Sequence, residues 1–424
     1  MLRDLLRSAS IRAAFVLGAG GVAFTVCNLV LARMLPTEAY GVLTLVIGIL
    51  SVASLAAPWG LDLVIARQGW VLGPPLRRAI LLSSLVSGLV TAAIAVLVYG
   101  LPASLAAALF VATAAAGVVQ GGVAHFQGQQ KFGRGAWLLQ LSNAALIPAA
   151  LASLVWSLTT AVIPSVLIAT TGLAGAIWTW RLVVRSQLAT RHRAEGGTRL
   201  VINTLWREAL SLVAITVAAS VFLQLERLVL VPAIGVAGLA LFGVVAALVG
   251  SPFRMIQQAV LFTLIPGLRA ASGVTARRTL LRREMALIIG AIGLGSVVLW
   301  FLAPLLAHLI LGGRYDLSGP LMLAAIVSGL LKVFSAFATS VAVALGDERD
   351  LRRVSATAWM SIGVSVAGAF IAAPWGLTGA LYGISVGWLT RTLAATGIAA
   401  PHLMNTHRNP AGEVGSGDLS HPVR

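Results

Sequence analysis

Long apolar runs, each about as long as a membrane span, follow one another along almost the whole chain. Short polar segments separate them. With a window near 20 residues, twelve runs can be delimited. They lie at about 11–33, 39–66, 79–99, 103–125, 137–157, 160–183, 208–231, 235–266, 285–310, 319–345, 354–374 and 377–399. Because about 20 apolar residues in a helix cross the hydrocarbon core, the pattern predicts an all-α polytopic membrane protein.

Two features refine this prediction. The first run is too long for a signal-peptide core, so we expect it to stay as the first span. The second and eighth runs exceed what a bilayer requires, and each contains a proline, Pro58 and Pro252, where a kink is expected. Composition agrees with the assignment, since 58% of residues are hydrophobic and only 10% are charged.

The basic residues indicate the topology. Most of the 30 Lys and Arg residues lie in the N-terminal segment, in every second loop and in the C-terminal tail, whereas the opposite loops contain only Arg33, Arg227 and Arg314. Basic loops are retained on the cytoplasmic side, so both termini are expected there. The net charge of +17 then reflects topology and anionic lipid head groups, and nucleic acid is not needed as a partner.

A weak internal repeat suggests a duplicated protein. Residues 29–58, placed without gaps on 223–252, pair Arg33 with Arg227, Gly41 with Gly235 and Pro58 with Pro252. We therefore expect two six-helix bundles, 1–183 and 208–400, with a basic cytoplasmic linker at 184–207. The polar, Pro/Gly-punctuated tail at 401–424 is expected to be disordered and cytoplasmic.

The segment LARMLPTEAYGVL (31–43) ends a first helix, turns at Pro-Thr-Glu and opens a second helix at aromatic-Gly. It resembles the polysaccharide exporters of the multidrug/oligosaccharidyl-lipid/polysaccharide exporter superfamily. The resemblance implies two bundles in a V around a central cavity, in the bacterial cytoplasmic (inner) membrane. It also implies a flippase that moves undecaprenyl-diphosphate-linked oligosaccharide to the outer leaflet by alternating access, for surface or exopolysaccharide synthesis beside a polymerase and glycosyltransferases.

An anionic diphosphate crossing the bilayer would need buried cations. Within the runs and away from the interface, four charges stand out: Asp62, Arg254, Lys332 and Arg391. Each costs roughly 2.5 to 3.5 kcal/mol at a helix centre, so each should face protein or water. Lys332 is a candidate phosphate ligand, a structural ion pair or a sign of a misplaced boundary. Arg254 is a candidate cavity cation, whereas Arg391 could extend its side chain to the interface.

Asp62 is the only deep carboxylate, and the repeat suggests Arg254 as its partner across the pseudo-twofold axis. Arg33, Glu226 and Arg227 are expected at the outer ends of spans, either as interface residues or as an outer gate in which Arg33 meets Glu226. Neutral polar residues that could line a sugar path, or bond between helices, are Asn28, Gln120, Gln140, Asn143, Gln224, Gln257 and Gln258.

Signs of catalysis are lacking in the sequence. The only lysines are Lys131 and Lys332, so no phosphate-binding loop of the Walker type exists, and no metal-ligand cluster is visible. We expect no enzymatic activity, metal or cofactor. Export could be driven by the membrane potential or by H⁺ or Na⁺ coupling, for which Asp62 would be the carboxylate. Two alternatives stay open: an ion-coupled multidrug-type antiporter, and a non-transporting scaffold for polysaccharide synthesis.

Overall fold

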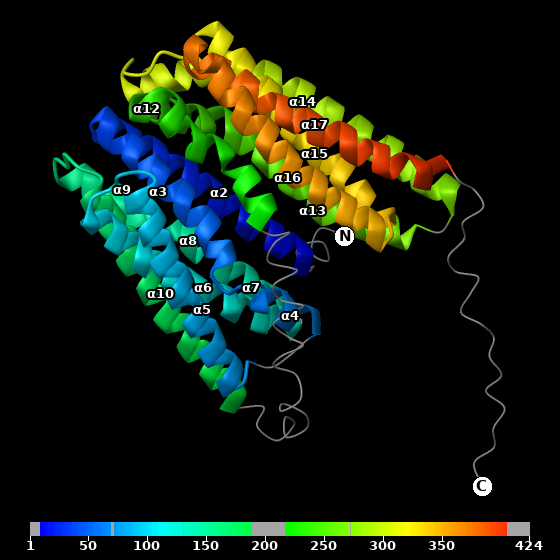
Figure 1. Ribbon diagram of the computed structural model, residues 1–424, viewed down its shortest axis with the longest axis horizontal. Coiled ribbons are helices and arrows are strands. Elements are labelled where there is room, and N and C mark those ends of the chain that lie inside the picture. The colour runs from blue at the N-terminus through cyan, green and yellow to red at the C-terminus, as the bar shows by residue number, and fades with distance from the viewer. Residues whose placement is uncertain (1–8, 69–71, 130, 189–216, 272, 405–424) are drawn as a thin grey trace.

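The protein, described here by a computed structural model, consists of helices arranged in two bundles. The structure describes residues 9–68, 72–129, 131–188, 217–271 and 273–404, and it contains no strand in these ranges. The two bundles form a V in Figure 1, with the first half of the chain on one arm and the second half on the other. This confirms the prediction of an all-α polytopic membrane protein built from two helical bundles.

The first bundle contains the predicted spans one to six. Its elements are α2 (Ala9–Met34), α3 (Thr37–Ala56), α4 (Leu61–Gln68), α5 (Pro74–Leu97), α6 (Ala103–Gly128), α7 (Phe132–Leu139), α8 (Leu141–Ala144), α9 (Leu146–Val155) and α10 (Val162–Leu188). The second span is thus divided into α3 and α4, and the fifth into three short helices. Prolines at N1 and N2 begin α5, where the missing N–H groups are not needed.

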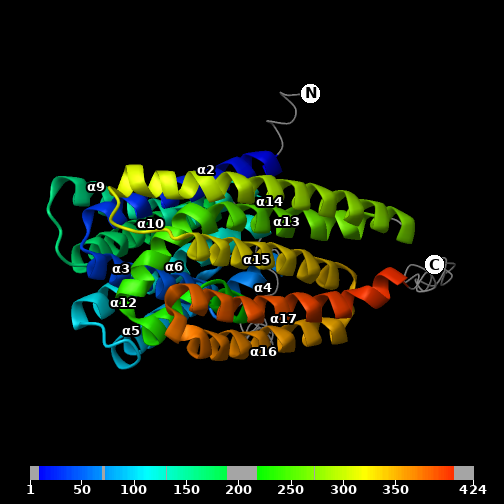
Figure 2. The ribbon, with the colours of Figure 1, turned by 90° about the horizontal axis from the view of Figure 1, so that it is seen from above.

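The second bundle begins with helical residues 217–223. The other elements are α12 (Leu225–Val245), a π-helical turn (Ala246–Gly250), α13 (Ser251–Ala270), α14 (Val274–Leu311), α15 (Gly319–Leu345), α16 (Glu348–Ala372), a 3₁₀ turn (Ala373–Trp375) and α17 (Gly376–Met404). A capping box formed by Asp347 and Asp350 starts α16. Figure 2 shows α14, α15, α16 and α17 running along one another.

Every predicted apolar run has its helix in the described residues, apart from 208–216, which lie outside them. Within the described part of the chain, eight segments are long and apolar enough to cross a membrane. Two of these, Leu225–Leu261 and Arg349–Leu403, each contain parts of two predicted spans, while Ala19–Met34 and Leu146–Val155 are shorter apolar helices. The membrane-protein assignment therefore does not depend on exact helix ends.

Both long runs are interrupted at the expected prolines. Four non-helical residues, Ala57–Gly60, separate α3 from α4, and Trp59 has a φ of 51° there. The π-helical turn lies directly before Pro252 of α13. A proline cannot donate the backbone hydrogen bond of a regular helix, so both interruptions have the same physical cause.

The predicted loop boundaries were wrong at three places. The basic residues 277–283 belong to α14, not to a loop, and α10 continues through Leu188 into the segment expected to be a linker. The first residues of the predicted disordered tail, 401–404, are helical. Charged residues ended the apolar windows in the sequence, but Arg and Glu are good helix formers and a helix continues beyond the membrane at little cost.

The register of the sequence repeat is also corrected. Gly235, which the repeat aligned with Gly41, has φ 82° and ψ 175°. These non-helical angles form a sharp turn inside α12, which therefore consists of two helical parts. Gly41 lies inside α3, and the equivalent turn of the first bundle is at Leu35–Pro36. Arg33 therefore lies close to its turn, whereas Arg227 lies two helical turns before Gly235 and is deep in the bundle.

The bundles meet at the end of the molecule that carries Pro36, Tyr99, Gly235 and residues 312–318, which we call the outer end according to the predicted topology. Here α3 packs on α12, and the missing side chain of Gly41 makes room for Val236. The Tyr99 hydroxyl donates to the Leu228 carbonyl oxygen at 3.2 Å. Toward the opposite, inner end the two arms diverge (Figure 1).

Candidate functional site

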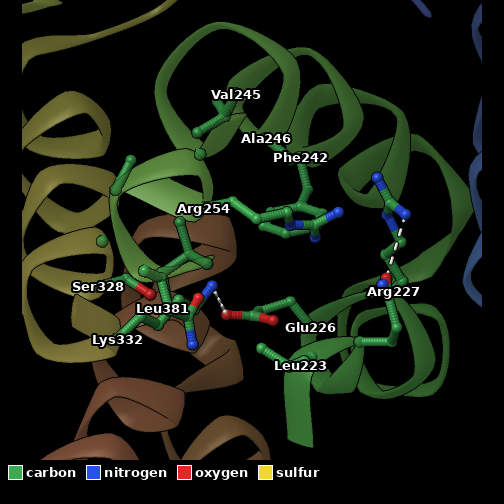
Figure 3. Close-up of a pocket in the computed structure, with 15 residues that line it drawn as sticks. Leu223, Glu226, Arg227, Phe242, Val245, Ala246, Arg254, Ser328, Lys332 and Leu381 are labelled. Carbon is green, nitrogen blue, oxygen red and sulfur yellow. Dashed lines mark hydrogen bonds and ion pairs between the residues drawn. The ribbon is translucent and has the colours of Figure 1, made fainter. Parts of the chain in front are cut away.

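A charged pocket lies within the second bundle, between the start of α12, the π-helical turn, α13, α15 and α17. Figure 3 shows the side chains of Glu226, Arg254 and Lys332 converging in it from three helices. The remaining lining residues are Leu223, Gln224, Arg227, Phe242, Val245, Ala246, Gly250, Gln257, Ala325, Ser328, Gly329 and Leu381.

Local sequence positions the charged side chains. Glu226 and Arg227 occupy the first turn of α12, after Gln224, which has non-helical backbone angles and begins the helix. The π-helical turn before Pro252 changes the phase of α13, so that Arg254 and Gln257 face the pocket one turn apart. On α15, Ser328 and Lys332 are one turn apart on the same face.

Glu226 is the centre of the charge arrangement. Its carboxylate is 2% exposed and forms an ion pair with the Lys332 ammonium, which is 21% exposed. Arg254 lines the same pocket. The buried carboxylate thus has an ion-pair partner on α15, and a further cation of the same pocket comes from α13.

Arg227 points to another side of the pocket. Its guanidinium donates to the side-chain oxygen of Gln224 at 3.1 Å and lies 6.0 Å from the ring of Phe24, which belongs to the first bundle. With Arg254 and Lys332, the pocket lining holds three cations and one carboxylate, a net charge of about +2.

The cavity itself is small, with a volume of about 50 Å³. A single water needs about 10–15 Å³ on this measure, so the space suits a few waters or a compact anionic group. A buried excess of positive charge is costly without a counter-charge. The pocket is therefore arranged to attract an anion.

An aromatic pair connects this pocket to Arg391. Lys332 lies 5.7 Å from the ring of Trp388. This ring packs against that of Phe222, with centroids 3.9 Å apart and an interplanar angle of 43°. The guanidinium of Arg391 lies 5.0 Å from the other ring, Phe222. Both aromatic side chains are almost completely buried. Cation–π contacts of this kind stabilise a cation that has left water.

The structure brings together some of the predicted site residues. Arg254 and Lys332 line one pocket, as expected for cations that bind an anionic cargo. Arg391 is connected to this pocket through the rings of Phe222 and Trp388. Of the alternatives for Lys332, the structure contains the ion pair. Among the predicted neutral residues, Gln224 and Gln257 line the pocket.

Asp62 does not join this cluster. It lies on α4 in the first bundle, and Arg254 lies on α13 in the second (Figure 1). The Asp62 Oδ1 atom is buried and has no hydrogen-bond partner among the described residues. The proposed Asp62–Arg254 pair was therefore wrong for this conformation, because the repeat register that suggested it does not hold.

The predicted outer gate also differs. Glu226 contacts Lys332, whereas Arg33 is exposed at the end of α2, so these two do not meet here. At the outer end it is Arg314 that connects the bundles: its guanidinium donates to the Leu35 carbonyl oxygen at 2.6 Å and to the Thr37 hydroxyl at 3.0 Å. This links the loop after α14 to the α2–α3 turn of the other bundle.

The sequence did not identify Trp388 or Phe222 as site residues, nor the contact of Arg314 with the other bundle. Trp388 and Arg391 are three residues apart on one helix, which places them on neighbouring positions of one face. That spacing was a usable signal. No signal in the sequence pairs Glu226 with Lys332, since the two come from different helices.

No family model matches the sequence, and no curated protein matches it significantly. Solved structures do match. One is described as the inward-facing conformation of a multidrug resistance MATE family transporter of the MOP superfamily; it is 14% identical, covers 91% of this chain and 94% of its own, and has a TM-score of 0.64. A MOP superfamily transporter from Pyrococcus furiosus, described as having a binding pocket of reverse polarity that suggests a different function, is 15% identical, with coverages of 94% and 97% and a TM-score of 0.62.

A third match is an outward-facing conformation of a multidrug resistance MATE family transporter of the MOP superfamily, 15% identical over 94% of this chain and 97% of its own, with a TM-score of 0.57. The agreement extends over nearly the whole length of each structure. The chain therefore has the two-bundle fold of the MATE transporters of the MOP superfamily.

Proposed function

We propose that this protein is a flippase, which moves a polyprenyl-diphosphate-linked oligosaccharide from the cytoplasmic to the outer leaflet by alternating access. The fold of a membrane transporter supports translocation in general. The observation that carries the proposal is the pocket of Arg227, Arg254 and Lys332 around a single carboxylate, Glu226. A net charge of about +2 matches a diphosphate, which carries about two negative charges.

The same pocket suggests how cargo is recognised. Glu226 and a phosphate compete for the cations of Lys332 and Arg254. A phosphate bound by the guanidinium of Arg254 gains charge-assisted hydrogen bonds, which are roughly twice as strong as neutral ones. The ion pair with Glu226 then serves as the resting counter-charge of the empty carrier, and cargo binding displaces it.

The size of the pocket suits the phosphate part of the cargo and not the glycan. A cavity of about 50 Å³ admits a phosphate-sized group but not a sugar chain. The diphosphate would be held in the second bundle, while the glycan would occupy the space between the diverging arms of the V.

The charge of the pocket argues against a cationic drug as the cargo. A cationic drug would be repelled by three cations, so drug export predicts an acidic pocket. The neighbour from Pyrococcus furiosus is described as having a pocket of reverse polarity, which suggests that charge reversal within this fold accompanies a different function.

Energetics favour export of such a cargo. Moving one charge through the membrane potential is worth about 2.3 kcal/mol per 100 mV, so a doubly anionic cargo leaving a negative interior gains about 4 to 5 kcal/mol. No ATP is needed for this step. Coupling to H⁺ or Na⁺ could add to it.

The test is complementation of a deletion strain by Arg254→Ala and Lys332→Ala, with Arg349→Ala, an exposed arginine at the start of α16, as control. We expect both pocket variants to lose surface polysaccharide and to accumulate lipid-linked precursor in the cytoplasmic leaflet. The control should export normally. Normal export by both pocket variants at normal protein levels would refute the proposed site.

An ion-coupled multidrug-type antiporter is the second candidate, and one observation favours it. Asp62 is a buried carboxylate in the first bundle whose Oδ1 has no hydrogen-bond partner among the described residues. Such a group could bind a proton or Na⁺ during transport. If Asp62→Asn abolishes proton- or sodium-driven efflux of cationic dyes by purified protein in vesicles, this candidate gains over the flippase; absence of dye efflux by the unmodified protein excludes it.

A further inference from the structure

A second cavity lies at the inner end of the second bundle, between α14, α15 and α17, and has a volume of about 680 Å³. This is within the range of small-molecule sites, about 300–1,000 Å³. Its lining is almost wholly apolar, with Met285 and Ile289 on α14 and Phe334, Phe337, Ala338 and Val341 on α15, and Arg282 is the one charged residue of the lining. We call this cavity the lateral groove.

The groove offers few polar groups besides Arg282. The hydroxyl of Thr392 donates to the Trp388 carbonyl oxygen at 2.8 Å, and that of Thr396 donates to the Thr392 carbonyl oxygen at 2.8 Å. Both threonines therefore satisfy their hydroxyls within α17. What an occupant meets is hydrocarbon along most of its length.

The charged end of the groove is defined by one face of α14. Arg278, Arg282, Met285 and Ile289 follow the i, i+4, i+7, i+11 spacing of a single helical face. Arg278 confirms the direction of this face, since its guanidinium donates to the Leu403 carbonyl oxygen of α17 at 2.6 Å. Arg282, one turn further along, is exposed and lines the groove at its rim.

The lateral groove is separate from the charged pocket. The α15 residues of the pocket, from Ala325 to Lys332, and those of the groove, from Phe334 to Val341, are offset by about half a turn at 100° per residue. They therefore lie on opposite faces of α15. The groove is therefore not an extension of the charged pocket.

We propose that the lateral groove is a binding site for an anionic phospholipid, with an acyl chain against the apolar faces of α14, α15 and α17 and the phosphate on Arg282. The groove runs about 10 Å along α14 from Arg282 to Ile289, in the direction in which the sequence becomes apolar. A phospholipid has the same order of groups, because its phosphate would lie at Arg282 and its acyl chain along the apolar residues toward Ile289. The bound lipid would fasten the long, otherwise exposed helix α14 to the bundle.

The experiment uses the purified full-length chain and measures the melting temperature during titration with phosphatidylglycerol or with zwitterionic phosphatidylcholine. We expect phosphatidylglycerol to raise the melting temperature, and Arg282→Gln to weaken this response about tenfold in lipid concentration. Arg283→Gln is the matched control, because it removes the same charge one residue away without lining the groove. A second variant, Ala338→Trp, fills the groove and should abolish binding.

Native mass spectrometry of the same proteins gives a second readout, the number of retained phosphatidylglycerol molecules. Three results would overturn the proposal: equal losses in Arg282→Gln and Arg283→Gln, an unchanged response in both Arg282→Gln and Ala338→Trp, or displacement of the lipid by a polyprenyl phosphate at equal concentration. The last would assign the groove to a cargo chain. Because the readout is binding and not transport, the result is independent of the proposed flippase activity.

Discussion

At the scale of single residues, the ion pair of Glu226 with Lys332 is the most consequential contact of the pocket. Glu226 is 2% exposed, so it depends on its cationic neighbours for stabilisation. Removing one partner of a buried pair leaves an uncompensated charge, which costs about 3 kcal/mol or more. Stability is therefore sensitive to this position, and so is the export that we propose, so the two must be measured separately.

We predict that Lys332→Ala lowers the free energy of unfolding by about 3 kcal/mol, because it leaves Glu226 without its ion-pair partner. The double variant Lys332→Met, Glu226→Gln should recover most of this loss, since it replaces the pair by neutral groups of similar size. Chemical denaturation of purified protein in detergent measures both. The double variant should be folded and still defective in export, which a purely structural role for Lys332 does not predict.

A second residue-scale prediction concerns Gly235. Its backbone angles, φ 82° and ψ 175°, belong to a region that is essentially restricted to glycine, and no other atom lies close enough to obstruct a side chain there. Gly235→Ala should therefore cost about 1 to 3 kcal/mol through backbone strain alone.

The control is Gly290→Ala, which adds a methyl group in open space within α14. Alanine is the better helix former, so this variant should be neutral or slightly stabilising. Thermal unfolding in the same detergent compares the two. Equal midpoints would mean that the turn at Gly235 tolerates a side chain, contrary to our account.

At the scale of elements, the loop after α14 closes the outer end. Arg314 donates to Leu35 and Thr37 at the α2–α3 turn, and its neighbour Tyr315 meets Tyr40 of α3 edge-on with ring centroids 6.4 Å apart. All these contacts connect the two bundles. They should be made when the outer end is closed and lost when it opens.

We expect Arg314→Ala to shift the equilibrium about tenfold toward the outward-open state, because it removes hydrogen bonds from a charged donor. Spin labels at Glu38 and Asp316, exposed residues on the two sides of the closure, report the distance across it. The fraction of long distances should rise in Arg314→Ala and stay unchanged in Arg349→Ala, which lies at the other end of the molecule. Identical distance distributions in both variants would show that Arg314 does not hold the closure.

At the scale of the whole molecule, the two bundles touch on one side and diverge on the other. The bundles are also connected away from the outer loops, within the helices. There the Thr25 hydroxyl of α2 donates to the Ser251 hydroxyl of α13 at 3.1 Å. If transport requires rocking of one bundle against the other, a covalent bond at this contact must stop it.

The corresponding prediction uses cysteines at these two positions in a Cys27→Ser background, which removes the only native thiol. Two thiols placed where hydroxyls are in contact are close enough to form a disulfide. Oxidation of the Thr25→Cys, Ser251→Cys protein should abolish transport, and a reductant should restore it. The single-cysteine proteins provide the control, and full transport by the cross-linked form would exclude a rocking mechanism.

The sequence predicted a good part of this molecule. The twelve apolar runs and both interruptions, at Pro58 and Pro252, follow from properties that each segment has alone: the free energy of moving its side chains out of water, and the missing N–H of proline. Helix ends were predicted less well, because a helix such as α14 continues past the membrane and the charged residues there do not stop it.

The sequence predicted some of the charged residues of the site, but not which of them pair with one another. That Arg254 and Lys332 face protein or water follows from the cost of placing them in lipid, whatever the fold. Arg254 and Lys332 line the same pocket as Glu226, whereas Asp62 lies in the other bundle. This arrangement depends on the turn at Gly235, the phase change before Pro252 and the packing of α15 on α13. Transfer free energies are local and can be read from the sequence, whereas the pairing of charges depends on which helix faces meet, and only the tertiary structure decides that.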